Sequence, residues 1–465
     1  MRLTLQEICA ALELAIPGQD CESTSVCSVV TDSRKVMPGA LFVCIAGART
    51  DGHTHAGAAV TAGAVAVLAS RPLPGVDAPV LVVPDTVKAL GQVGALWRSR
   101  TQARVTGITG TAGKTTLKEV LATILAGAGK TARNALNLNN QIGLPSSILA
   151  TDGDERFWVM EAGISQEGDM DALGEILRPD LGIILNVGPG HTQGLGEKGV
   201  AWHKARLLAH LAKGGTGLVS ADYPQLRREA AYHDVSLRYF SCSDPDVEFY
   251  GRWLGNQDGL GRYVLRLAGQ EFEVTAPFGG AYGAENCIAA AAAAHLLGLD
   301  PEVIAHGLAV ARLPQQRFAR LRLGSWDVID DSYNANPLSM QRMLEAAATQ
   351  ARGRKLVAVL GEMGELGKDS DRLHEGLGHL LARLSPAAIF WAGGQAEAVA
   401  GGLKAAGYGG LWLPVEDPQA FTARWQEIMG DGDGVVLFKG SRSNGLETYL
   451  EELRTVLTHS PEGTD

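Results

Sequence analysis

The stretch GITGTAGKTTLKE, residues 107–119, decides the class of the fold. An apolar, β-branched run at 105–108 leads into a loop containing Gly110 and Gly113, and a helix-like apolar pattern follows from Leu117. A strand, a glycine-rich loop and a helix in this order form the context that a phosphate-binding loop requires. The glycines let successive N–H groups point at one anion, and the helix N-terminus adds partial positive charge.

The residue types in this loop suit a phosphate ligand. Lys114 can reach terminal phosphates, and the Thr115 hydroxyl can coordinate Mg²⁺. The residues expected to contact the ligand are Gly110, Thr111, Ala112, Gly113, Lys114, Thr115 and Thr116. A glycine-rich turn that binds nothing is the alternative, but a GKTT run that opens a helix after a β-run argues against it.

Composition and charge narrow the class of protein. The 465 residues are 46% hydrophobic and 20% charged, which predicts an enzyme-like chain of two to four domains. A net charge of −10 without a basic cluster argues against a nucleic-acid partner. The six cysteines form no C-x-x-C pair, and the N-terminal segment lacks the pattern of a signal peptide. We therefore expect a cytoplasmic protein with reduced cysteines.

Alternating strand and helix patterns predict an α/β protein of three domains. Residues 1–98 are expected to form a small α/β domain that opens with an amphipathic helix. Residues 99–314 are expected to form a central domain whose parallel sheet carries the phosphate loop, with an antiparallel appendage at about 240–276 and a buried alanine-rich helix after Asn286. Residues 315–465 are expected to form a Rossmann-like domain. Apolar runs place strands at 40–45, 65–69, 80–83, 157–161, 181–187, 326–329, 356–360, 388–391 and 435–438.

Several polar residues follow these strands, where ligands bind in open parallel sheets. Glu161 ends the run 157–161 and is a candidate Mg²⁺ ligand, although a solvated glutamate is an equal alternative. His191 lies among glycines after the next strand and is a candidate metal or phosphate ligand. A structural histidine is the alternative. Lys204 lies at the start of a predicted helix, and Arg317 can clamp a phosphate. Both are also consistent with ordinary surface positions.

Three polar loops follow strands of the third domain. They are DDSYNANP (330–337), GEMGELG (361–367) and KGSRSNG (439–445). The first offers donors and acceptors for a ribose or a peptide amide, although a structural turn is compatible with the same residues. KGSRS supplies cations and hydroxyls for a carboxylate. Because parallel strands end at one edge of a sheet, we expect the three loops to converge on one site.

Together these motifs resemble those of the Mur ligase family over nearly the whole chain. The most diagnostic segments are NLNNQIGLP (137–145) and the three loops of the third domain, whereas the GTAGKTT loop is common to the whole family. TDSRKVMPGALFVCIAG (31–47) and DGHTHA (51–56) resemble a nucleotide-sugar-binding domain. Within the family, the chain is similar to ligases that add D-alanyl-D-alanine to UDP-N-acetylmuramoyl-tripeptide.

The resemblance implies roles for the matching residues. ATP would be held by the phosphate loop, Asn286 at the adenine, Asp331 at the ribose and Arg317 at a phosphate. Two Mg²⁺ ions would be held by Thr115, Glu161, His191 and a carbamoylated Lys204. The catalytic residues would be Lys114, Glu161, His191 and Lys204. The UDP-muramoyl-peptide would meet Ser33, Arg34, Asn137, Asn139 and Asn140, and D-alanyl-D-alanine would meet Asn334, Asn336, Lys439 and Ser441.

Some positions depart from the family pattern. Tyr282 and Gly283 stand where a His-Asn pair is usual, and Arg206 stands where a glutamate is common. Gln315–Gln316–Arg317 replaces a Pro-Gly-Arg turn, and Asn444–Gly445 follows KGSRS where a methionine is often found.

The resemblance implies an ATP-dependent amide ligase of peptidoglycan precursor synthesis that acts through an acyl phosphate. One domain would hold the UDP-sugar, one ATP and one the amine, closing about hinges near residues 98 and 314. A sibling ligase, either MurE or the folylpolyglutamate type, and a nucleotide-binding regulator without ligase activity are the alternatives. We expect a monomer that is not membrane-embedded and that acts on small molecules.

Overall fold

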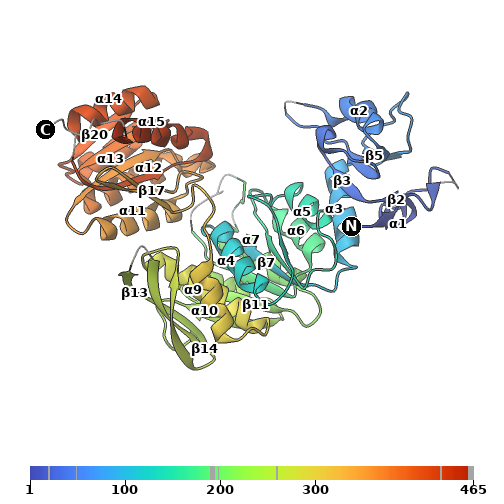
Figure 1. Cartoon of the computed structure of the whole chain (residues 1–465), viewed down its shortest axis with the longest axis horizontal. Helices are drawn as coiled ribbons and strands as arrows, with labels where there is room; N and C mark the ends of the chain where they lie inside the picture. Colours follow the sequence, from blue (N-terminus) through green and yellow to red (C-terminus); the bar gives the residue numbers. More distant parts are fainter. Residues whose placement is uncertain are drawn as a thin grey trace.

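The computed structural model describes residues 1–18, 21–48, 50–188, 194–196, 198–257, 260–429 and 432–458. Figure 1 shows three bodies along the chain, with the central one below and between the N-terminal and C-terminal ones. Each body is built around its own mainly parallel sheet, which confirms the predicted α/β class. Among the described residues, no helix is both long and apolar enough to cross a membrane.

The N-terminal body is a four-stranded parallel sheet with helices packed against it. Its sheet has the order β3–β4–β5–β6, and a short antiparallel pair, β1 and β2, lies beside it. The elements are β1 Leu3–Thr4, α1 Leu5–Ala11, β2 Ser25–Val26, β3 Ser28–Val30, β4 Ala40–Val43, α2 Ala56–Thr61, β5 Ala64–Ala69, β6 Val80–Val82 and α3 Thr86–Arg98. The predicted amphipathic helix is confirmed as α1, whose Leu5 and Ile8 are buried.

The helix α3 fastens this body to the central one. The Trp97 indole donates to the Thr151 hydroxyl at 2.8 Å, and the Arg98 guanidinium donates to the Leu177 carbonyl at 2.8 Å. The C-terminal end of α3 is therefore anchored by side chains as well as by the chain itself.

The central body contains a nine-stranded sheet in the order β15–β14–β13–β12–β11–β10–β7–β9–β8. Its strands are β7 Arg104–Thr109, β8 Thr131–Arg133, β9 Phe157–Glu161, β10 Leu181–Ile184, β11 Thr216–Ser220, β12 Ser236–Ser241, β13 Phe249–Gln257, β14 Leu260–Leu267 and β15 Gln270–Ala276. Its helices are α4 Lys114–Ala126, α5 Gly143–Leu149, α6 Asp169–Leu177, α7 Gly199–Ala205, α8 Pro224–Ala230, α9 Ala281–Leu296 and α10 Pro301–Val310. The alanine-rich segment is confirmed as part of a buried helix, α9, which packs beside α4.

The C-terminal body contains a six-stranded sheet in the order β16–β17–β21–β18–β19–β20, parallel except for the edge strand β16. Its strands are β16 Ala319–Leu323, β17 Trp326–Asp330, β18 Lys355–Gly361, β19 Ala388–Ala392, β20 Leu411–Val415 and β21 Gly434–Lys439. Its helices are α11 Pro337–Ala351, α12 Ser370–Leu384, α13 Ala396–Ala405, α14 Pro418–Ile428 and α15 Leu446–Thr458. The adjacent strands β17, β21 and β18 carry the three polar loops, so their predicted convergence is confirmed.

Three local predictions differ from the structure. The predicted antiparallel pairing is present in β13–β15, but these strands extend the central sheet, because β13 pairs in parallel with β12. Lys204 lies at the end of α7, not at the start of a helix, because the helical turns begin at Gly199. The apolar residues after β10 also continue past its last paired residue, Ile184, so the predicted strand was too long.

Candidate active site

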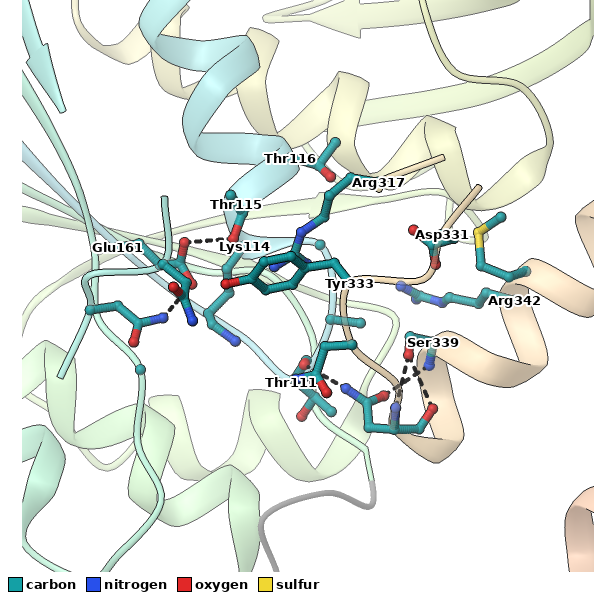
Figure 2. Close-up of a pocket in the computed structure, with 18 of the residues that line it drawn as sticks. Thr111, Lys114, Thr115, Thr116, Glu161, Arg317, Asp331, Tyr333, Ser339 and Arg342 are labelled. Carbon is teal, nitrogen blue, oxygen red and sulfur yellow. Dashed lines mark hydrogen bonds between the residues drawn. The ribbon is translucent and has the colours of Figure 1, made fainter. Parts of the chain in front are cut away.

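A cavity of about 300 Å³ lies between the central and C-terminal bodies. Figure 2 shows the phosphate-loop residues on one side of it and residues after β17 on the other. Sixteen of the predicted residues line it: Thr111, Ala112, Gly113, Lys114, Thr115, Thr116, Asn137, Asn139, Asn140, Glu161, Asn286, Arg317, Asp331, Asn334, Asn336 and Lys439. The tertiary structure therefore brings most of the sequence-predicted set to one place.

The phosphate loop has the predicted strand–loop–helix structure. It leaves β7 after Thr109, turns at Gly113 with a φ of 80°, and enters α4 at Lys114. A side chain at Gly113 would be strained by this φ, and its Cβ would lie 3.0 Å from the Asn286 amide oxygen. The first N–H groups of α4 have no partner within the helix, so they are available to an anion.

Lys114 and Lys204 converge on one backbone oxygen. Each ammonium nitrogen donates to the Gly110 carbonyl at 3.0 Å. Lys204 is only 2% exposed. Burial lowers its pKa well below the ordinary value, and the positive charge of Lys114 lowers it further, against the opposing effect of Glu161. Burial also lowers the pKa of Lys114. Burial therefore favours the neutral, nucleophilic form of these amines more than it does for an exposed lysine.

Glu161 ends β9 as a buried carboxylate without a salt bridge to any cation among the described residues. Its side chain accepts hydrogen bonds from the Thr115 hydroxyl at 2.8 Å and the Asn139 amide at 2.6 Å. The residue is 1% exposed, so it is not the solvated glutamate that was the alternative. Both of these donors are neutral, so the carboxylate suits a cation, and its oxygens are ligands that Mg²⁺ prefers.

The loop that carries Asn139 is held by a buried lysine that the sequence analysis missed. Lys118 is 0% exposed and donates to the carbonyls of Asn134 and Leu136 at 2.6 and 2.8 Å. Asn134 in turn accepts from the Glu161 backbone N–H at 3.0 Å. Leu136 has a positive φ of 48°, which is unusual for a leucine. The signal available in the sequence was a lysine within the buried face of an amphipathic helix.

We predict that Lys118→Met lowers kcat/KM by about 10- to 100-fold, because the loop that supports Glu161 loses its anchor. Steady-state kinetics on the folded variant would measure this. The same change at the exposed Lys404 is the control. Parent-like kinetics in a folded Lys118→Met protein would contradict the support role.

On the C-terminal side, Lys439 and Asp331 form a buried ion pair. The Lys439 ammonium donates to the Asp331 carboxylate and, at 3.0 Å, to the Asn334 carbonyl. The other Asp331 oxygen accepts from the Phe318 N–H at 3.0 Å. These contacts fix the loop after β17 against the end of β21, and they use Lys439 for positioning.

Asn334 and Asn336 are already engaged by the chain. The Asn334 side-chain oxygen accepts from the adjacent Ala335 N–H at 2.9 Å, and a structural turn lies earlier in the loop, where Asp330 accepts from the Ser332 N–H at 3.1 Å. Asn336 caps α11 through Ser339 and donates to the Thr111 carbonyl at 3.1 Å, which links the C-terminal body to the phosphate loop. Arg317 lies over the Tyr333 ring at 4.3 Å, beside the same cavity.

Other predicted residues lie apart from the cavity lining. Ser33 and Arg34 are in the N-terminal body, where Arg34 is paired with Asp32 at 2.8 Å. Ser441 accepts from the Gly364 N–H at 2.7 Å and joins the second and third polar loops. Gly110 and Lys204 are connected to the lining residue Lys114, because the Gly110 carbonyl accepts from both lysine side chains. His191 falls outside the described residues.

The departures from the family pattern have structural reasons. Tyr282 lines the cavity and packs edge-on against Phe318, with 5.5 Å between ring centroids. A Cβ at Gly283 would lie 2.3 Å from the Tyr263 hydroxyl, so that position needs glycine. Arg206 binds Asp171 on α6 at 2.7 Å instead of approaching Lys204.

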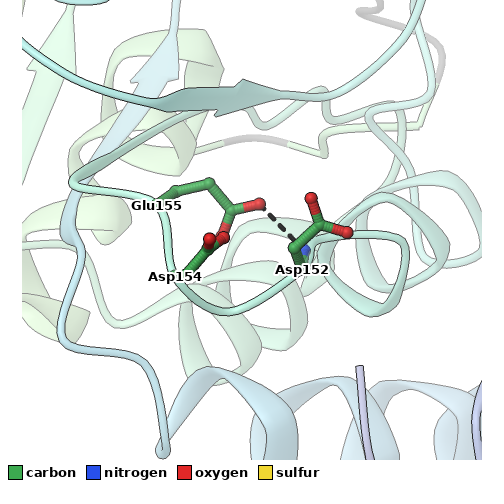
Figure 3. A group of neighbouring side chains, drawn as sticks. All are labelled: Asp152, Asp154 and Glu155. Atoms are coloured by element: carbon green, nitrogen blue, oxygen red, sulfur yellow. Dashed lines mark hydrogen bonds between the residues drawn. The ribbon is translucent and has the colours of Figure 1, made fainter.

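One acidic group outside the cavity could be mistaken for a metal site. Asp152, Asp154 and Glu155 lie close together (Figure 3). Lys130 binds both aspartates, at 2.8 Å for Asp152. Glu155 accepts from the Asp152 N–H at 2.8 Å and the Trp158 indole at 3.1 Å. The group is therefore satisfied by the protein itself.

The chain matches known families in three consecutive ranges. Residues 25–98 match the Mur ligase family catalytic domain, residues 108–294 the Mur ligase middle domain, and residues 316–442 the glutamate ligase domain of Mur ligases.

Relatives match over nearly the full length. UDP-N-acetylmuramoyl-tripeptide--D-alanyl-D-alanine ligase of Escherichia coli (strain K12) is 30% identical over 97% of this chain and 98% of its own. A crystal structure of MurF from Acinetobacter baumannii superposes with a TM-score of 0.87 at 29% identity, covering 98% of this chain and 99% of that one. The MurF ligase of Thermotoga maritima in complex with ADP gives 0.83 at 27% identity, covering 93% and 98%.

Proposed function

Because this chain belongs to the Mur ligase family, we propose that it joins D-alanyl-D-alanine to UDP-N-acetylmuramoyl-tripeptide in an ATP-dependent reaction. The observation that carries this proposal is the single cavity lined by both the phosphate loop and the strand-end loops of the C-terminal body. In a ligase of this kind the acyl group must be activated on the phosphate-loop side of the cavity and attacked by an amine from the side of the C-terminal body. A sibling ligase is less well supported, because relatives matched over nearly the whole chain carry the D-alanyl-D-alanine activity in their names.

The reaction has two steps. A carboxylate oxygen of the tripeptide attacks the γ-phosphorus of ATP, which forms an acyl phosphate and releases ADP. The amine of D-alanyl-D-alanine then attacks the acyl carbon, phosphate leaves with the C–O bond electrons, and the nitrogen loses a proton. The product is UDP-N-acetylmuramoyl-pentapeptide. The protein needs no nucleophilic side chain for either step, because its task is to position the groups and exclude water.

The ATP phosphates would lie on the phosphate loop. The free N–H groups at the start of α4 and the Lys114 ammonium would bind the phosphate oxygens. Asn286 is 1% exposed, and its side-chain oxygen has no hydrogen-bond partner among the residues that the structure describes, so it can accept from a base amine. Asp331 and Arg317, which enter the same cavity from the C-terminal body, would hold the ribose and a phosphate.

Thr115 and Glu161 fit a Mg²⁺ ion, since they offer a hydroxyl and a buried carboxylate within hydrogen-bond distance of each other. When bound, Mg²⁺ would neutralise charge on the transferring phosphoryl group. The proposal includes His191 as a further ligand. Asn139 would orient the Glu161 carboxylate through the bond that it donates.

Lys204 would be carbamoylated. Its amine is buried, and burial lowers its pKa, which favours the neutral form that attacks CO₂. Attack of the neutral amine on CO₂ forms an N–C bond and releases one proton, so the neutral amine becomes a carbamate anion. The anion would relieve the repulsion between Lys204 and Lys114 and would supply oxygen ligands for a second Mg²⁺.

The remaining assignments concern the substrates. Residues 1–98, with Ser33 and Arg34, would hold the UDP-sugar, and Asn137, Asn139 and Asn140 would meet its peptide. Residues 99–314 would bind ATP. Residues 315–465 would bring D-alanyl-D-alanine through Asn334, Asn336, Lys439 and Ser441. A protein that uses ATP and a UDP-linked precursor would work in the cytoplasm.

The test is phosphate release by the purified protein with ATP, Mg²⁺, UDP-N-acetylmuramoyl-tripeptide and D-alanyl-D-alanine, with each omitted in turn. We expect release only when all four are present, with the pentapeptide product identified by mass. Use of a single amino acid in place of the dipeptide would identify a sibling ligase. ATP binding without release in any mixture would identify a nucleotide-binding regulator.

A further inference from the structure

An ion pair joins the C-terminal body to the central one beside the phosphate loop. Arg342, on α11, donates from Nη1 to one Glu285 carboxylate oxygen at 2.7 Å and from Nη2 to the other at 3.0 Å. Glu285 lies on α9 of the central body. Its side chain is 4% exposed and that of Arg342 is 17% exposed. The contact is therefore bidentate and largely removed from water, which is the strong form of an arginine–carboxylate pair.

Glu285 is connected to the phosphate loop by hydrogen bonds through one further residue, Asn186. It accepts from the Asn186 side-chain amide at 2.7 Å. The Asn186 side-chain oxygen accepts from the N–H groups of Thr111 and Ala112 at 3.0 and 2.9 Å, and its amide also donates to the Ala112 carbonyl at 3.0 Å. Asn186 is 0% exposed, so all of these bonds are buried.

The geometry leaves little freedom at Asn186. Its oxygen takes both loop N–H donors, so its amide must face Ala112 and Glu285. A carboxylate at position 285 fixes this orientation, because a carboxylate only accepts. Tyr223 also donates to Glu285, at 3.0 Å.

The opposite charges of Arg342 and Glu285 are paired only while the C-terminal body is docked on the central one. Burial alone would lower the pKa of Arg342, but the adjacent Glu285 carboxylate raises it above the ordinary value. If the C-terminal body moved away, Glu285 would lose its only arginine partner among the described residues. The docked arrangement and the ordered loop are thus favoured together.

We propose that Arg342 is a positioning residue for the nucleotide site, which holds the phosphate loop from the C-terminal body through Glu285 and Asn186. This inference rests on the proposed function only in taking the phosphate loop to bind ATP. Because the loop is held in its binding conformation when Arg342 is docked, docking strengthens nucleotide binding. By thermodynamic reciprocity, bound nucleotide favours docking to the same degree.

A second link supports the same direction of coupling. The Asn336 amide, at the start of the same helix α11, donates to the Thr111 carbonyl at 3.1 Å. The loop is thus contacted directly at Thr111 and indirectly at Ala112 by one helix of the C-terminal body. Both side chains line the cavity; Arg342 is connected to the loop through Glu285 and Asn186, whereas Asn336 contacts the loop directly.

The experiment is equilibrium binding of a non-hydrolysable ATP analogue to the full-length protein, without peptide substrates. We expect Arg342→Gln and Glu285→Gln each to weaken binding by roughly 10-fold. The double variant should bind the analogue no more weakly than whichever single variant binds it more weakly. Both substitutions break the same chain of contacts from Arg342 through Glu285 and Asn186 to the phosphate loop. X-ray scattering should show a less compact analogue-bound form for each variant than for the parent. Since no ligation is measured, these results do not depend on whether the ligase assay succeeds.

The matched control is Arg383→Gln, which breaks an exposed arginine–glutamate pair within the C-terminal body. It should bind the analogue as the parent does. Weak binding in Arg342→Gln with parent-like binding in Glu285→Gln would overturn the relay and would mean that Arg342 contacts the nucleotide directly. Additive losses in the double variant would also overturn it. Glu285→Gln preserves size, and thermal unfolding without ligand identifies any variant that binds poorly because it is misfolded.

Discussion

Replacing Lys204 by alanine is expected to lower kcat by roughly 10³-fold, and a small carboxylate such as acetate is expected to restore part of the loss. The physical reason is the position of this amine. It is 2% exposed, lies beside a second lysine, and has a pKa well below the ordinary value because of burial. An amine of that kind is suited to become a carbamate, and acetate in the alanine cavity would replace the missing oxygens.

The rescue identifies the chemistry at this position. Methylammonium, which replaces the amine but not the carbamate, should not restore activity. Incorporation of label from isotope-labelled bicarbonate into the parent protein, and its absence from the Lys204→Ala variant, would identify the modified residue. Equal rescue by methylammonium and acetate would show that Lys204 acts as a cation.

Replacing Lys114 by methionine is expected to lower kcat by roughly 10³-fold with a much smaller effect on ADP binding. Lys114 begins α4 and its ammonium donates to the Gly110 carbonyl at 3.0 Å. We expect that ammonium to turn toward the terminal phosphates when ATP is present. Charge on the transferring group rises in the transition state, so the loss should fall mainly on the chemical step.

Single-turnover measurement of ADP formation, together with equilibrium binding of ADP, separates these two effects. Lys404→Met makes the same change on the exposed surface of α13 and should leave both unchanged. A Lys114→Met variant that binds ADP far more weakly but turns over normally at saturation would show that Lys114 serves binding and not catalysis.

Much of the fold follows from local sequence patterns. The phosphate loop, the strand ending at Glu161 and the buried alanine-rich helix were all predicted from spacing and residue type, and all are present. These features have short-range causes: a glycine turn, an apolar run and a helical period. The hairpin strands β13–β15 were misjudged because antiparallel strands can form a separate unit or extend an existing sheet, and only pairing partners distinguish the two.

The site was predictable where a functional residue directly follows a strand. Among the proposed site residues, Glu161 ends β9 and Asp331 directly follows β17, and both line the cavity. Lys118, Asn186, Glu285 and Arg342 were not found, because each is unremarkable in its own segment. Lys118 is one lysine on a helix, and its importance appears only when the loop at 134–136 folds over it.

The sequence alone determined the α/β class, the phosphate loop with its lysine and threonine, and the polar loops that follow the strands of the C-terminal sheet. Tertiary structure alone decided that Lys204 is buried against Gly110 and that Arg342 reaches the phosphate loop through Glu285 and Asn186. The physical reason is range. Backbone turns and amphipathic periods depend on neighbours along the chain, whereas burial and charge pairing depend on residues that lie 57 to 99 positions apart and meet only after folding.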